Sequence, residues 1–134
     1  MDDTARLREH GISPSAQRMA VASYVLHTSE HPSADEVLTR VRKGFPYISR
    51  ATVYNTLNRF VEVGLLRQFV LSAGRVVFDP RTEDHHHFID DGTGEIQDVP
   101  WNALKVSSVA GLEGLNVREY QVVMRGTKSP RKSR

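Results

Sequence analysis

The chain has 134 residues, no cysteine and a formal net charge of +2. This length accommodates one compact domain or two very small ones, and 39% hydrophobic with 25% charged residues excludes an intrinsically disordered polymer. The absence of cysteine excludes disulfides, thiolate zinc sites and thiol catalysis, so a metal would need imidazole and carboxylate ligands. No apolar run approaches the roughly 18 residues that cross a bilayer, and the acidic start Met1-Asp2-Asp3 is unlike a secretory signal. We therefore expect a cytoplasmic protein with no membrane partner.

The charges are unevenly distributed along the chain. Residues 1–78 carry ten Lys/Arg against seven Asp/Glu, residues 79–124 carry three against nine, and residues 125–134 carry five against none. A basic first half suggests a polyanionic partner, and an acidic middle suggests a cation site. Solvated faces also produce such charge runs, so this pattern alone does not decide the function.

Three helices are predicted in the first half. Ser13-Pro14 has the form of an N-cap followed by proline, and predicts a helix from about Pro14 to Thr28. The segment Ser33-Ala34-Asp35-Glu36 is a capping box and begins a second helix. Ser49 can cap a third helix that Gly64 ends.

The third predicted helix has two different faces. Val53, Leu57, Phe60 and Val61 recur at helical spacing and form a buried stripe. The other residues supply the Arg, Asn and Thr chemistry that reads base edges in a major groove while neighbours grip phosphates. The DNA-contact candidates are Arg50, Thr52, Tyr54, Asn55, Asn58 and Arg59. A solvated helix face is the alternative interpretation.

A β-hairpin is predicted directly after these helices. The β-rich runs Leu66–Leu71 and Arg75–Asp79 flank Ser72-Ala73-Gly74, which is a turn signature. Three helices followed by a hairpin form a winged helix, and this order favours DNA binding over a merely solvated face.

The second half predicts a small αβ unit. The expected elements are a strand His85–Ile89, a turn Asp91–Gly94, a strand Glu95–Val99, a helix Trp101–Ala110 and a strand Val117–Arg125. A unit of this size cannot readily stabilise its own core, so we expect a homodimer. The predicted fold class is α+β. Its parts are a winged helix-turn-helix domain in residues 1–79, a hinge at 80–84, a dimerisation domain at 85–125 and a basic, disordered tail at 126–134.

Three consecutive histidines are the strongest chemical signal. Alternation along a strand places His85 and His87 on one face and His86 on the other. Asp98 joins the first pair if the two strands pair across the intervening turn. This nitrogen and oxygen set suits Fe(II), Mn(II), Co(II) or Zn(II). An expression tag is the alternative, but the run is internal and followed by strand-forming Phe88 and Ile89.

The order of these motifs resembles the ferric uptake regulator family. The resemblance rests on residues 49–57 (Ser-Arg-Ala-Thr-Val-Tyr-Asn-Thr-Leu), Gly64-Leu65-Leu66, the hairpin ending at Asp79 and the triple histidine, and it extends from about Leu7 to Arg125. It implies a winged helix joined to an αβ dimerisation domain, with a regulatory metal between them. It also implies five ligands: His31, Asp79, His85, His87 and Asp98.

The chain departs from the family pattern in two ways. The paired Cys-x-x-Cys motifs that hold structural zinc in many members are absent, so we expect no structural zinc held by four cysteines and a dimer that forms without it. A further metal site of some members needs a late histidine, and no histidine follows His87. We therefore expect one complete site per subunit.

Two branches of the family are similar to this chain. Asp98, where iron-sensing members tend to have glutamate, resembles the peroxide regulator branch. The cysteine-free chain and its Tyr-Asn-Thr-Leu-Asn run at residues 54–58 also resemble the iron response regulators, in which a triple histidine is linked to haem. That resemblance would implicate His85, His86 and His87 in haem binding. Our first interpretation is a repressor of palindromic operators in double-stranded DNA, with Fe(II) or Mn(II) as co-repressor. Peroxide would be sensed by iron-catalysed oxidation of the ligand histidines.

Other functions are weighed against this one. An iron- or haem-responsive regulator is the nearest alternative, and Zn(II) could occupy the site in a purified sample. A small non-haem iron enzyme is a distant alternative, because two histidines and one carboxylate can form a facial triad. Five protein ligands would leave little room for substrate, so we expect no enzyme. Metal storage would leave the polar helix face and the hairpin unexplained.

Overall fold

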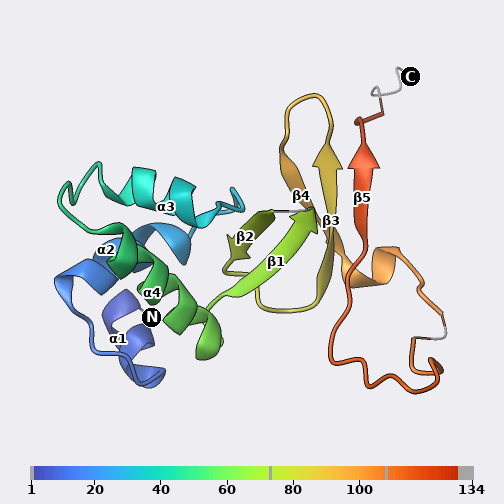
Figure 1. Ribbon diagram of the computed structural model, residues 1–134, viewed down its shortest axis with the longest axis horizontal. Helices are drawn as coiled ribbons and strands as arrows, with labels where there is room; N and C mark the ends of the chain where they lie inside the picture. The colour runs from blue at the N-terminus through green and yellow to red at the C-terminus, as the bar shows by residue number, and fades with distance from the viewer. Residues whose placement is uncertain (1, 73, 108, 130–134) are drawn as a thin grey trace. The chain divides into compact units, whose positions relative to one another are not determined.

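The computed structural model describes residues 2–72, 74–107 and 109–129. The chain divides into two compact units, Met1–Thr82 and Glu83–Arg134. The first unit contains four helices and a hairpin, and the second contains a three-stranded sheet (Figure 1). This mixture of helix and strand confirms the α+β fold class. Within the described residues, every helix is too short or too polar to cross a membrane.

The first unit begins with a helix that the sequence analysis did not predict. This helix, α1 (Asp3–Glu9), is capped by Asp2, whose side chain accepts from the backbone N–H of Ala5. The next helix, α2 (Ala16–Val25), is shorter than predicted and is capped by Ser15. The prediction of Ser13 as its cap was therefore wrong. Pro14 precedes the helix instead of occupying its first turn.

The other two caps of this unit are as predicted. Ser33 and Glu36 form both bonds of the capping box at the start of α3 (Ala34–Val41). The Ser49 side chain accepts from the backbone N–H of Thr52 at the start of α4 (Arg50–Glu62). Gly64 follows α4 with φ of 84°, a backbone conformation that glycine adopts without strain.

The four helices enclose one hydrophobic core. Its side chains come from all four helices and from the residues that enter the hairpin. The predicted stripe of α4 supplies Val53, Leu57 and Phe60, each with no exposed surface. Burying these side chains fixes the rotation of α4 about its own axis, because the face that carries them must point into the core. Except for the buried Thr56, the polar residues of α4 therefore lie on its outer side.

The hairpin consists of β1 (Arg67–Ser72) and β2 (Arg75–Asp79), paired antiparallel from Arg67 opposite Asp79. The predicted turn includes Ala73, which lies outside the described residues. Figure 1 shows α4 leading directly into β1, so the hairpin stands beside the helix that precedes it. This arrangement is the predicted winged helix.

The second unit is a sheet of order β4-β3-β5. The predicted pairing of β3 (His85–Asp90) with β4 (Ile96–Pro100) across the glycine-containing turn is confirmed, and it is antiparallel. The third strand, β5 (Val123–Gly126), pairs parallel to β3, with His87 opposite Val123. It begins later than the predicted strand at Val117.

The predicted helix Trp101–Ala110 was wrong. Only a single 3-10 turn, η1 (Trp101–Ala103), forms there, and the described residues between 104 and 122 contain no helix or strand. Isolated helices of about ten residues are marginal in water. This one also carries serine and β-branched residues at its centre, which favour other conformations. Part of this prediction, Ser108, and the end of the predicted tail, residues 130–134, lie outside the described residues.

Candidate functional site

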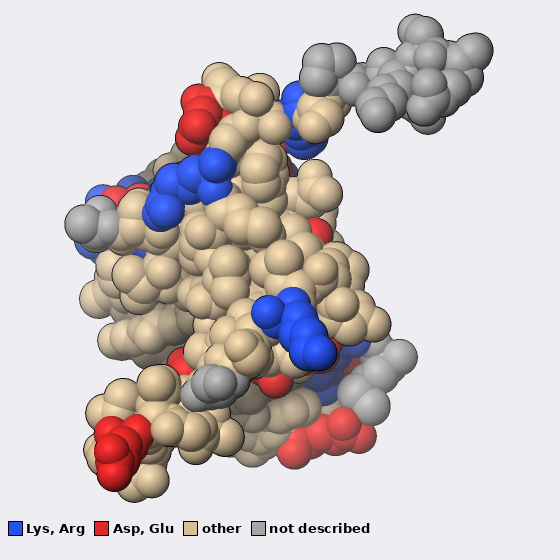
Figure 2. All heavy atoms as spheres, turned by 90° about the vertical axis from the view of Figure 1, so that its right-hand side faces the viewer, with Lys and Arg blue, Asp and Glu red and all other residues tan. Residues whose placement is uncertain are grey.

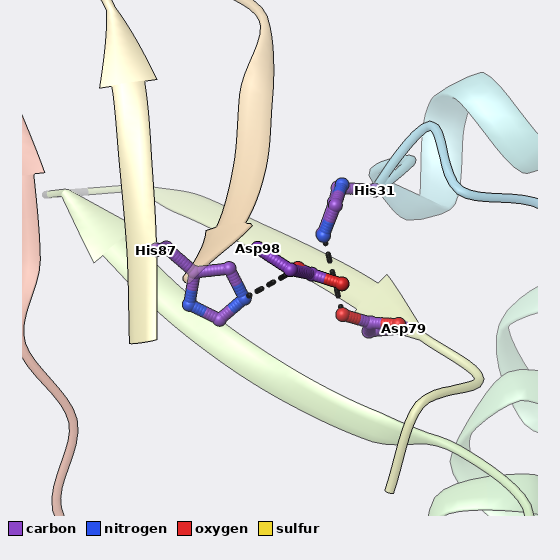
Figure 3. Close-up of side chains that lie close together, drawn as sticks. All are labelled: His31, Asp79, His87 and Asp98. Carbon is purple, nitrogen blue, oxygen red and sulfur yellow. Dashed lines mark ion pairs between the residues drawn. The ribbon is translucent and has the colours of Figure 1, made fainter. Parts of the chain in front are cut away.

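Three potential metal ligands converge on the paired strands of the second unit. His85 and His87 lie on the same face of β3, and Asp98 is directly opposite His87 on β4. The distances from Asp98 Oδ1 are 3.4 Å to His85 Nε2 and 3.6 Å to His87 Nε2. Figure 3 shows the His87 ring directed at the Asp98 carboxylate. The structure thus brings together the three residues that strand alternation predicted.

Hydrogen bonds on the other side of each ring set the tautomers of these histidines. His85 Nδ1 lies 2.7 Å from the carbonyl oxygen of Glu83, and His87 Nδ1 lies 2.8 Å from Gln121 Oε1. Because carbonyl oxygens only accept, each Nδ1 carries a proton. In both rings Nε2 is the nitrogen directed at Asp98, and a hydrogen bond behind the ring at Nδ1 is the usual arrangement of metal-binding histidines.

Gln121 is a functional candidate that the sequence analysis missed. It lies 34 residues after His87, just before β5. Only the parallel pairing of β3 with β5 brings the two together. No spacing or motif in the sequence could have indicated this contact.

His86 lies on the opposite face of β3, as alternation predicted. Its Nδ1 accepts a hydrogen bond of 2.9 Å from the Val122 backbone N–H, and its ring stacks on Trp101 at 4.5 Å between centroids. Trp101 in turn contacts Tyr120 at 4.8 Å. Burial lowers the pKa of His86, so the imidazole is neutral. His86 therefore stabilises the sheet and does not share a binding face with His85 and His87.

The first unit holds a separate buried pair. His31 Nε2 and Asp79 Oδ2 are 3.2 Å apart, and each side chain is 3% exposed (Figure 3). The backbone N–H of Phe78 donates to the carbonyl oxygen of Pro32 at 2.9 Å, which holds the end of β2 beside the residues that precede α3. Asp79 Oδ1 accepts from the Arg81 backbone N–H at 2.9 Å. These contacts fix both side chains relative to each other.

His31 adopts a strained backbone conformation. Its φ of 53° is the only positive value among the described non-glycine residues. A histidine in the left-handed region costs on the order of 1 kcal/mol, and such strain persists where the surrounding structure imposes it, often at functional sites. In this backbone conformation the His31 ring lies beside the Asp79 carboxylate.

These two groups contain the donor chemistry of a transition-metal site. Neutral imidazole nitrogens and carboxylate oxygens suit Fe(II), Mn(II) and Zn(II), and the chain has no cysteine thiolate to favour copper. The residues therefore fit a divalent metal.

The DNA-contact candidates all lie on α4, on the side away from the core. Arg50, Asn55, Asn58 and Arg59 are exposed, and Thr52 and Tyr54 are half-buried. Several of them already have partners within the first unit. Arg59 pairs with Glu62 at 3.3 Å, and Arg50 pairs with Asp35 of α3.

A groove of about 470 Å³ adds residues that the sequence analysis did not select. It lies where the start of α2 meets α4, and its lining combines Thr52, Asn55, Thr56 and Arg59 with Ser15, Gln17 and Arg18. Arg18 is positioned by a 2.9 Å hydrogen bond to the Ser13 carbonyl oxygen. Arginine, amide and hydroxyl groups of this kind grip phosphate oxygens. Only helix packing reveals that α2 contributes to this surface.

The model of the ferric uptake regulator family matches residues 9–125. The chain belongs to the ferric uptake regulator family. A peroxide-responsive repressor, PerR, of Staphylococcus aureus is 34% identical over 103 residues, covering 77% of this chain and 70% of that protein. The resemblance that residues 49–57 and the triple histidine suggested is thereby confirmed.

Two solved structures of this family have the same fold. The Campylobacter jejuni peroxide stress regulator is 28% identical with a TM-score of 0.65, covering 98% of this chain and all of that one. The Vibrio cholerae ferric uptake regulator is 21% identical with a TM-score of 0.71, covering 95% and 100%. The chain is thus a metal-responsive regulator of the ferric uptake regulator family and not an enzyme.

Proposed function

We propose that this protein is a metal-dependent transcriptional repressor that senses peroxide. Residues 1–79 would bind operator DNA, residues 85–125 would form the dimer, and residues 80–84 would act as a hinge. The observation that carries this proposal is the set of His85, His87 and Asp98, in which both Nε2 atoms are directed at one carboxylate and both Nδ1 atoms are held by carbonyl oxygens. The similarity to peroxide regulators supports the choice of signal.

We further propose that one metal ion is held jointly by the ligands of both units. The first unit would contribute His31 and Asp79, and the second would contribute His85, His87 and Asp98. A joint site would couple metal binding to the angle between DNA-binding and dimerisation domains. In a dimer, that angle sets the spacing of the two recognition helices, which must match half-sites about one helical turn of DNA apart or a multiple of it. Metal would then favour the DNA-binding form by its higher affinity for it.

The peroxide response would depend on the imidazoles themselves. The chain has no cysteine, so thiol oxidation is excluded as the sensing chemistry. Bound Fe(II) would activate peroxide, so that one peroxide oxygen is added to an imidazole carbon and the other leaves as water, with both electrons coming in net from the imidazole. His31, His85 and His87 are the nearest oxidisable side chains, and oxygen added to an imidazole weakens its donor nitrogen. Loss of a donor lowers metal affinity, and with it affinity for DNA.

Dimerisation is supported by the surface of the second unit. Four of its large apolar side chains are substantially exposed: Val106, Leu112, Leu115 and Val117, at 38%, 49%, 63% and 42%. In the view of Figure 2, much of the described surface is neither basic nor acidic, and groups of charged side chains lie between the uncharged areas. Exposed apolar side chains favour protein association when they lie together. Sedimentation of a chelator-treated sample should show a dimer, and a stable monomer would contradict this part of the proposal.

The main experiment separates peroxide sensing from iron sensing. Iron-loaded protein is treated with dilute peroxide, and peptide mass spectrometry and retention of operator DNA are measured together. We expect oxygen added at His31, His85 or His87 together with loss of DNA affinity, whereas manganese-loaded protein should keep both its mass and its affinity. Unmodified histidines with full DNA affinity after peroxide would reject peroxide sensing in favour of an iron-responsive repressor.

Haem sensing is the weaker alternative. All three histidines of the run are at most 2% exposed, and His86 faces away from the other two and already accepts a backbone hydrogen bond. A haem would have to open this sheet before reaching an imidazole. Titration with haemin that left the sheet intact and produced a histidine-ligated spectrum would revive this alternative.

A further inference from the structure

A three-membered cluster joins α3 to the start of α4. The Arg50 guanidinium forms an ion pair with Asp35, and the Tyr54 hydroxyl donates to the same carboxylate oxygen at 2.5 Å. Arg50 also donates to the Tyr54 hydroxyl oxygen at 3.3 Å, and its guanidinium carbon lies 5.8 Å from the centre of the Tyr54 ring. Two of the six DNA-contact candidates are therefore held by one acidic residue.

This cluster is exposed and contributes little to folding. The side chains of Arg50 and Asp35 are 61% and 67% exposed, and ion pairs in water are worth between zero and about 1 kcal/mol. The pKa of Asp35 is held below its ordinary value. The hydrogen bond from Tyr54 is the largest cause, and the hydrogen bond from Arg50 is the second. The interaction is therefore complete above the ordinary pKa of an aspartate and is lost only as the pH falls below it. At neutral pH the carboxylate is fully charged.

A carboxylate and a DNA phosphate are both anionic acceptors of hydrogen bonds from an arginine guanidinium, so Asp35 and a phosphate would bind the same donor groups of Arg50. Phosphates are present in every DNA sequence, so a free Arg50 would strengthen binding to all DNA alike. A base edge that offers a bidentate contact to arginine is present only at particular sequences. An acidic residue that occupies the guanidinium therefore reduces non-specific binding more than binding to the right operator.

We propose that Asp35 is a specificity-determining residue, which competes with DNA phosphates for Arg50 and Tyr54 and so lowers affinity for non-operator DNA. This inference rests on the proposed DNA-binding function. On non-operator DNA, Arg50 stays paired with Asp35 and makes no phosphate contact. On the operator, Arg50 exchanges the carboxylate for a base edge.

A second cluster, formed by Tyr24 of α2, Glu30 before α3 and Arg40 in the last turn of α3, offers a matched control. Glu30 accepts from the Tyr24 hydroxyl at 2.9 Å and pairs with Arg40 at 2.9 Å, and the Arg40 guanidinium lies 4.7 Å from the centre of the Tyr24 ring. This cluster likewise joins an acidic residue, an arginine and a tyrosine, but none of its members is on α4. Glu30→Gln removes one negative charge from the same unit without releasing Arg50.

The experiment compares manganese-loaded wild type, Asp35→Asn and Glu30→Gln on two duplexes. One is the sequence that wild type selects from a randomised pool, and the other is a scrambled duplex, each measured from low to high salt. For Asp35→Asn we expect affinity for scrambled DNA to rise about fivefold, the most that an exposed pair contributes. The slope of log affinity against log salt should steepen by about 0.9, one added phosphate contact. In Asp35→Asn the affinity for the operator should rise less than the affinity for scrambled DNA. Glu30→Gln should change neither the ratio of operator affinity to scrambled-DNA affinity nor the salt slope.

The double variant Asp35→Asn with Arg50→Gln tests the route of the effect. If Asp35 acts by occupying Arg50, the gain on scrambled DNA disappears in the double variant. A gain that persists without Arg50, or a wild-type specificity ratio in Asp35→Asn, would overturn the inference while leaving the DNA-binding function intact. Loss of operator affinity alone in Asp35→Asn would also overturn it, by making Asp35 a positioning residue. Failure of wild type to select any sequence would reject the proposed function itself.

Discussion

Replacing Gln121 with leucine should weaken metal binding without removing a metal ligand. The amide oxygen of Gln121 accepts the Nδ1 proton of His87 at 2.8 Å, and His87 has no exposed surface. In the leucine variant the buried Nδ1–H of His87 loses its hydrogen bond to the Gln121 amide oxygen, which destabilises this tautomer by about 1–3 kcal/mol. The ring can avoid part of that cost by moving its proton to Nε2. That nitrogen is the one directed at Asp98, so the tautomer that can bind metal becomes rarer.

We expect Gln121→Leu to lower Mn(II) affinity by about 10- to 100-fold, the usual effect of losing a partner behind a metal-binding histidine. Competition with a fluorescent chelator measures this affinity, and nitrogen NMR of the metal-free imidazole reports the tautomer. Gln121→Glu retains an acceptor and should bind metal well. Gln97→Leu, at an exposed position of β4, is the control for a lost amide. The reasoning fails if Gln121→Leu matches Gln97→Leu in affinity while Nδ1 stays protonated.

Three further outcomes are expected. Trp101→Ala, which removes the ring stacked on His86, should lower the free energy of unfolding in urea by about 1–3 kcal/mol, and an unchanged midpoint would show that the stack is not stabilising. Arg18→Ala should weaken binding to operator and scrambled DNA equally and reduce the salt slope by about 0.9, whereas an unchanged slope would exclude the α2 groove from the interface. Mn(II) at about one hundred times its Kd should stabilise wild type by about 2.7 kcal/mol but not His87→Ala, as judged by chemical denaturation.

Much of this protein was determined locally, and those features were predictable from the sequence. The capping box at Ser33 and Glu36 depends on residues three apart, and so does the cap at Ser49. The division of the triple histidine between two faces follows from strand alternation. The pairing of His87 with Asp98 follows from a short turn between adjacent strands. Each of these features involves only residues that are close together in the sequence, so local backbone geometry determines how they are arranged.

Other features required the tertiary structure, because they join residues that are distant in sequence. Gln121 meets His87 only because β5 pairs parallel to β3. Asp35 meets Arg50 and Tyr54 only because α3 packs against α4. The predicted helix after Pro100 was wrong because a segment of about ten residues with serine and β-branched residues at its centre has too weak a local preference to form a helix by itself. Sequence therefore determined which side chains could bind metal and DNA, and packing decided which neighbours orient them.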